Sequence, residues 1–175
     1  MKDYTITPNQ KRMIDDVKNL YPKRLYYLVI QQNRLKPNLT INELKKHVRN
    51  GIKSYVRTFF SLEYRTNLEN ELIQYVCFLE TSKEFQQSLY QTNLNTDEVY
   101  LGLHFHLFIS SRSGQVHIPQ LIHYIFLSLT SQPLKSEAIK LFDYFKVENL
   151  DERFIQYHTK QHFRCESPEM YMKNI

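Results

Sequence analysis

The longest uninterrupted apolar stretch, Leu25 to Ile30, is the feature that most limits what this chain can fold into. A membrane-spanning helix needs about 20 consecutive apolar residues, so this stretch is far too short to cross a bilayer. It combines aromatic and β-branched residues between Pro22 and the polar segment Asn33 to Asn38, a setting that is typical of a buried strand. Residues 24–32 are therefore predicted to form a strand of a sheet.

The composition indicates one folded domain. Of the 175 residues, 42% are hydrophobic and 23% are charged, and no linker, repeat or low-complexity tract interrupts them, so residues 1–175 are expected to form a single domain. The two cysteines, Cys77 and Cys165, are too few for a disulfide framework or a four-cysteine zinc site, which favours a reducing compartment. No apolar stretch follows Met1 to Thr5, so no secretory signal is expected there. We therefore expect a soluble intracellular protein.

The remaining hydrophobic patterns alternate between strands and helices. Thr40 and Glu43 form a capping-box pattern that predicts a helix over 41–60. Further elements are expected as strands at 71–80 and 99–110, and as helices at 121–130, 136–145 and 151–163. This order predicts an α+β fold of the ferredoxin-like or RRM-like type, with helices packed on a central antiparallel sheet.

The strongest local signal for chemistry is His104-Phe105-His106 in the expected strand 99–110. Side chains two positions apart in a strand point to the same face, so the two imidazoles project together and can bind one divalent ion. The apolar neighbours place the pair in the middle of a strand that should be central to the sheet. The alternative is a pair of hydrogen-bonded core histidines without a ligand.

Glu80 ends the preceding expected strand, which can place its carboxylate beside the two imidazoles if the strands pair antiparallel. Two nitrogens and one oxygen, with coordination positions left open, suit Mn²⁺, Mg²⁺ or Zn²⁺ and leave room for a substrate phosphate. A solvated charge at the end of a strand is the alternative interpretation of Glu80.

Tyr157 and Lys160 lie three positions apart in the expected helix 151–163 and therefore on one helix face. A phenol is a poor nucleophile at neutral pH unless a base, a cation or a polarised electrophile assists it, and a nearby ammonium supplies part of that help. The chain has 13 tyrosines, so such a pair also arises by chance. Tyr144 and Tyr171 lack a lysine at this spacing.

Together these motifs resemble the HUH endonucleases, and specifically the rolling-circle replication initiators of plasmids and phages. The resemblance rests on the early hydrophobic strand, Glu80, the pair His104 and His106, and the Tyr157 to Lys160 motif, in that order along the chain. It implies a metal centre formed by Glu80, His104 and His106. It also implies that Tyr157 is the nucleophile and that Lys160 helps to position or neutralise the phosphate.

The resemblance further implies a metal-dependent enzyme that nicks and rejoins single-stranded DNA at a replication origin through a 5′-phosphotyrosine link. The expected cofactor is a divalent ion, Mn²⁺ or Mg²⁺ before others. The expected setting is the cytoplasm of a bacterial or archaeal host that carries the plasmid or phage, with a host helicase as a further partner and no membrane contact.

A row of basic residues on the expected helix 41–60 agrees with a nucleic-acid partner. The net charge is +5, and four cations recur at every fourth position with another beside them: Lys45, Arg49, Lys53 and Arg57, with Lys46. Like charges at this spacing repel, and a phosphate backbone would relieve the repulsion. The alternative is a solvated helix face. We call these five residues the basic row.

Two other functions fit the same sequence. A non-catalytic single-stranded nucleic-acid-binding domain would present Tyr26, Tyr75 and Phe105 on its sheet to stacked bases. A structural zinc module is the weaker of the two, because structural zinc normally takes four ligands and only three candidates converge here.

Overall fold

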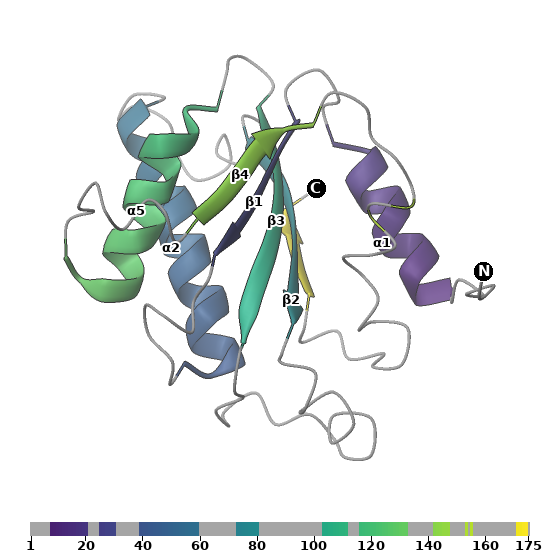
Figure 1. Ribbon diagram of the computed structural model, residues 1–175, viewed down its shortest axis with the longest axis horizontal. Helices are drawn as coiled ribbons and strands as arrows, with labels where there is room; N and C mark the ends of the chain where they lie inside the picture. The colour runs from purple at the N-terminus through teal and green to yellow at the C-terminus, as the bar shows by residue number, and fades with distance from the viewer. Residues whose placement is uncertain are drawn as a thin grey trace.

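The centre of the molecule is a five-stranded antiparallel sheet with the strand order β4-β1-β3-β2-β5 (Figure 1). The structure, a computed structural model, describes residues 8–20, 25–30, 39–59, 73–80, 103–111, 116–132, 142–147, 153, 155 and 171–174. The strands are β1 (Leu25–Ile30), β2 (Ile73–Glu80), β3 (His104–Ser111), β4 (Phe142–Lys146) and β5 (Tyr171–Asn174). The predicted antiparallel sheet in an α+β fold is confirmed.

Two helices, α2 (Ile41–Phe59) and α5 (Ile118–Thr130), cover one face of the sheet. Strand residues of alternate positions, among them Phe105 and Leu107, pack beneath these helices. The helices themselves pack so closely that a Cβ atom added at Gly51 would lie 2.6 Å from the Cα atom of Ile125. Gly51 therefore permits the close approach of the two helices. We call this side of the sheet the helix face.

The predicted start of α2 is confirmed in detail. The Thr40 N–H donates to Oε2 of Glu43 at 2.9 Å, and the Glu43 N–H donates to Oγ1 of Thr40 at 3.2 Å. These two bonds satisfy backbone donors that the first turn of a helix leaves without partners. At the start of α5 (Ile118–Thr130), Pro119 occupies the first turn, where its missing N–H costs nothing.

The opposite face of the sheet carries His104 and His106, and we call it the histidine face. Helix α1 (Pro8–Lys18) lies over this face in Figure 1. Apolar residues of α1 and strand residues of this face form a second core with Ile155. Met13, Ile14 and Val17 come from α1, and Leu20 follows it. The strand residues are Tyr27, Val76, Phe78 and Phe108. The described elements thus form three layers, with the sheet in the middle.

Several expectations about the elements were wrong. Residues 142–146 do not continue a helix from 136: they form β4, which pairs with β1 from Tyr26 to Ile30. Pairing along the backbone of a buried strand outweighs the local helical pattern there. Strand β3 begins at His104, so the histidines lie at the start of this strand and not in its middle. Its central place in the sheet is confirmed.

Two elements, α1 and β5, were not expected from the sequence. Of the expected helix 151–163, Arg153 and Ile155 are helical, and its other residues lie outside the described part of the chain. Among the described residues, no helix combines the length and the apolar character that crossing a membrane requires.

Candidate metal and phosphate site

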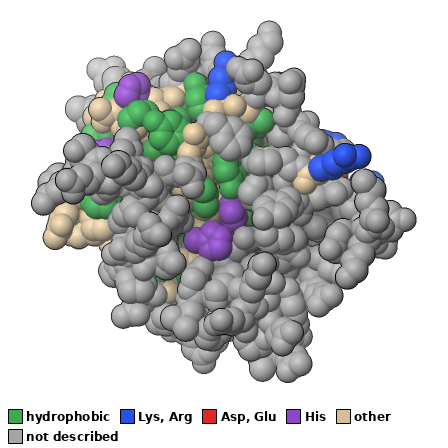
Figure 2. All heavy atoms as spheres, in the orientation of Figure 1, with side chains coloured by type: hydrophobic (Ala, Val, Ile, Leu, Met, Phe, Trp, Pro, Cys, Tyr) green, Lys and Arg blue, Asp and Glu red, His purple; other side chains and the backbone are tan. Residues whose placement is uncertain are grey.

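His104 and His106 bring two imidazole rings together on the histidine face. Their ring centroids are 5.0 Å apart, and the ring planes are inclined at 72°. The His106 side chain is buried, with 7% of its surface exposed, whereas His104 is half-buried. Figure 2 shows histidine side chains at the surface near the middle of the view, next to hydrophobic side chains. The pair therefore joins a buried imidazole to a more accessible one.

The register of β2 against β3 determines which position lies opposite each histidine. Glu80 is the Cα partner of His104, and Phe78 is the Cα partner of His106. Directly opposite positions of an antiparallel pair share one face of the sheet, so position 80 belongs to the histidine face. The Glu80 side chain itself lies outside the described residues.

Tyr27 reaches His106 from the neighbouring strand β1. Its hydroxyl oxygen lies 2.6 Å from Nδ1 of His106, and both side chains are buried. The two rings stack with centroids 6.0 Å apart and planes inclined at 20°. This contact was not predicted from the sequence, because the register between β1 and β3 cannot be derived from the local pattern. The only signal was the place of Tyr27 at an alternate position of an apolar strand.

The donor set fits a divalent ion of the kind that the resemblance implies. Imidazole nitrogens and a carboxylate suit Mn²⁺, Mg²⁺ and Zn²⁺, and His104 stands at the start of its strand, where coordination positions can stay open. No cluster of three histidine, cysteine or carboxylate side chains occurs among those that the structure describes, a set that does not include Glu80. The third ligand thus stays a prediction from the register.

Tyr157 and Lys160 both lie outside the described residues. The nearest described position, Ile155, is helical and fully buried in the core of the histidine face. Ile155 therefore packs on the same side of the sheet as the two histidines.

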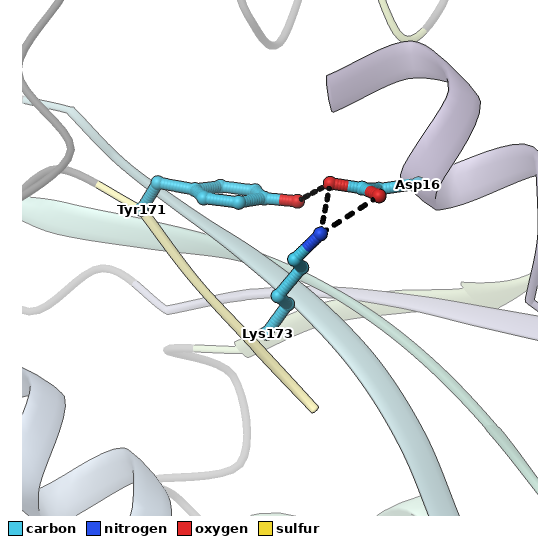
Figure 3. Close-up of polar contacts among 3 residues, drawn as sticks. All are labelled: Asp16, Tyr171 and Lys173. Carbon is cyan, nitrogen blue, oxygen red and sulfur yellow. Dashed lines mark hydrogen bonds and ion pairs between the residues drawn. The ribbon is translucent and has the colours of Figure 1, made fainter. Parts of the chain in front are cut away.

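Tyr171 also lies on the histidine face, where it stacks on Phe78 with ring centroids 5.4 Å apart. Its hydroxyl donates to Oδ2 of Asp16 in α1, and the Lys173 ammonium pairs with the same carboxylate at 2.9 Å (Figure 3). Burial and the adjacent Asp16 carboxylate raise the pKa of Tyr171 well above its ordinary value. These contacts tie α1 to β5 at the edge of the sheet.

The basic row lies on the other side of the sheet from the histidines, because α2 belongs to the helix face. Successive residues of the row advance about 40° around the helix at each step, since an α-helix has 3.6 residues per turn. Lys45 is accordingly half-buried, whereas Lys46, Arg49, Lys53 and Arg57 are exposed. The row therefore winds from the edge of the core into solvent.

Two members of the basic row also have partners in the sheet. The Arg49 guanidinium hydrogen-bonds to the Tyr75 hydroxyl of β2 and offsets part of the rise that burial causes in the pKa of Tyr75. Burial also raises the pKa of the Cys77 thiol. The positive charges of Lys45 and Arg49 oppose this rise. Lys45 thus lies near Cys77, and Arg49 lies near Tyr75, so the row begins toward the end of β2 that carries Glu80.

The aromatic platform expected for a non-catalytic binding domain is wrong. Tyr75 is 7% exposed and Phe105 is 0% exposed, and both belong to the core beneath α2 and α5. Tyr26 is partly buried against the same core. Bases cannot stack on rings that the helix layer covers.

Comparison with protein-family models found none that matches the chain, and comparisons with curated proteins and with solved structures found no significant match.

Proposed function

We propose that the protein is a metal-dependent enzyme that nicks and rejoins single-stranded DNA, of the HUH type that initiates rolling-circle replication. The single observation that carries this proposal is the placement of His104 and His106 on the central strand with position 80 opposite His104. Three potential ligands on one sheet face, from two paired strands, suit one divalent ion with open coordination positions.

The connectivity supports the finer fold that the resemblance implies. Along the chain, β1, α2, β2, β3, α5 and β4 follow the β-α-β-β-α-β order of ferredoxin-like folds, and these four strands lie in the order β4-β1-β3-β2. Strand β5 then extends the sheet beside β2. The histidines lie on the face opposite α2 and α5, and a substrate phosphate would approach them from the side of the half-buried His104.

The chemistry assigns a separate task to each group. A bound divalent ion supplies Lewis-acid stabilisation of the charge on the scissile phosphate. The Tyr157 oxygen attacks phosphorus in line, a 5′-phosphotyrosine bond forms, and the bond to the 3′ oxygen breaks. The phenolic proton passes to solvent, the 3′ oxygen takes up a proton, and Lys160 helps to neutralise the phosphate. The phosphotyrosine conserves the phosphodiester energy, so a later 3′-hydroxyl can rejoin the strand.

The basic row supplies contacts to the DNA backbone in this proposal. From Lys45 to Arg57 the row spans about 18 Å of helix at 1.5 Å per residue. Phosphate contacts of this kind position the strand and carry little sequence information. A strand that reaches both the row and the histidines must pass around the edge of the sheet, because the two lie on opposite faces. A replication origin and a host helicase remain the proposed partners.

A nicking assay tests the proposal. A labelled single-stranded DNA library with a randomised region is incubated with protein and Mn²⁺ and then separated on a denaturing gel. We expect cleavage and a covalent adduct, and we expect both to disappear with a chelator and in the double variant His104→Ala/His106→Ala. The matched control is His117→Ala/His123→Ala, which removes two histidines from α5 and its N-cap. Full activity of the first double variant would overturn the proposed metal centre.

The competing function is a non-catalytic single-stranded nucleic-acid-binding domain. It shares the basic row with the nickase but not the need for a metal ion. DNA binding without any cleavage in Mn²⁺, Mg²⁺ or Zn²⁺ would favour it.

A further inference from the structure

Tyr27 makes a buried contact with His106. Nothing in the sequence motifs accounts for this contact. The Tyr27 hydroxyl oxygen lies 2.6 Å from Nδ1 of His106. The tyrosine ring is held in turn by Phe108 of β3, with centroids 5.2 Å apart and ring planes inclined at 56°. Tyr27 is 4% exposed, so bulk water has little access to its hydroxyl. The position of the hydroxyl is thus fixed by packing from two sides.

The partner of one ring nitrogen determines what the other nitrogen can do. A neutral imidazole carries its proton on one nitrogen and offers a lone pair on the other. Histidines that bind metal ions commonly donate the second N–H to an oxygen acceptor, which fixes the tautomer and the orientation of the ring. In His106 the nitrogen beside Tyr27 is Nδ1, so an ion bound by this ring would bind at Nε2.

We propose that Tyr27 is the positioning residue of the metal centre: its hydroxyl accepts the Nδ1–H of His106 and so directs the Nε2 lone pair to the ion. This inference rests on the proposed function, because it concerns the same site. It assigns a role to β1, whose residues contribute none of the proposed ligands. Tyr27 acts through His106 and does not touch the substrate.

The first test is the affinity for Mn²⁺, measured by calorimetric titration of the full chain without DNA. Tyr27→Phe removes only the hydroxyl and keeps the ring that packs on Phe108 and His106. Loss of such an outer partner typically weakens metal binding by about 10- to 100-fold, and we expect a loss in this range. The matched control is Tyr55→Phe, which removes a buried hydroxyl on the helix face. That hydroxyl accepts the backbone N–H of His117 at 2.9 Å. We expect that variant to bind Mn²⁺ like the wild type.

The second test reads the tautomer directly from the ¹⁵N chemical shifts of the His106 ring in the metal-free protein. We expect the proton on Nδ1 in the wild type and a mixture of tautomers in Tyr27→Phe. A wild-type proton on Nε2, or unchanged Mn²⁺ affinity in Tyr27→Phe, overturns the role of Tyr27 and leaves the proposed function intact. If the wild type binds no Mn²⁺, the metal centre and this inference are both wrong.

Discussion

Glu80 and His104 are direct partners across an antiparallel pair, the last residue of β2 opposite the first residue of β3. The pairing puts a carboxylate position and an imidazole on the same face where both strands end. His104 is half-buried and His106 is buried, so His104 is the more accessible of the two imidazoles.

Glu80→Gln tests this relationship. The change keeps the size of the side chain but removes the negative charge that a divalent cation needs, so we expect Mn²⁺ affinity to fall by at least about tenfold, or ~1.4 kcal/mol. Calorimetric titration measures the affinity. Asp15→Asn is the control, because it removes one charge from an exposed site on α1. Equal affinities of Glu80→Gln and the wild type would remove Glu80 from the ligand set.

Two charge-neutralising double variants locate the DNA. Lys53→Gln/Arg57→Gln removes two exposed cations of the basic row, and Lys11→Gln/Lys18→Gln removes two exposed cations of α1. If the row contacts phosphates, only the first pair should reduce the slope of log K against log salt, by about 1.4 for two contacts with single-stranded DNA. Fluorescence anisotropy at several salt concentrations measures the slope. A reduction confined to the α1 pair would place the strand on the histidine face.

Gly51→Ala tests the packing of α2 against α5. Alanine favours a helix over glycine by about 1 kcal/mol, but the added Cβ would meet the backbone of Ile125. Forcing the helices apart should outweigh that gain and lower the free energy of unfolding by about 1 to 3 kcal/mol. Urea denaturation measures the change. The neighbouring exposed Asn50→Ala should leave stability equal or slightly higher, and similar results for both variants would contradict the close packing.

Asp16→Ala tests the contact that joins α1 to β5. The change removes the acceptor of the Tyr171 hydroxyl and the partner of Lys173. Lys173 is well exposed, so the ion pair contributes little, and the unsatisfied Tyr171 hydroxyl should account for most of a loss of about 1 to 3 kcal/mol. Thermal denaturation at neutral pH measures it. Asp15→Ala, on the exposed side of the same turn, should change stability by no more than about 0.5 kcal/mol.

The elements that could be predicted are those with a strong local signal. The apolar run of β1 and the capping box of Thr40 and Glu43 determine structure through contacts close in sequence, and both are present as expected. The formation of strand β4 depends instead on pairing with β1, which lies more than a hundred residues earlier in the chain. Strand β5 is too short to leave a periodic pattern, and it forms beside β2 at the edge of the sheet.

The candidate site divides in the same way. The shared face of His104 and His106 follows from the period of a strand, which the sequence contains. The partnership of Tyr27 with His106 depends on the register between β1 and β3, in which Val29 is the Cα partner of His106. A shift of the register by one residue would place Tyr27 on the helix face, and no local pattern specifies that register.

Mass spectrometry of the trapped protein–DNA adduct tests the central claim most directly. Tyr157→Phe removes only the attacking hydroxyl, so we expect unchanged folding, Mn²⁺ binding and DNA affinity but no cleavage and no adduct. In the wild type, with Mn²⁺ and the single-stranded library, we expect a nucleotide attached to Tyr157. A nucleotide attached to Tyr144 or Tyr171, or nicking by Tyr157→Phe at the wild-type rate, would contradict the account.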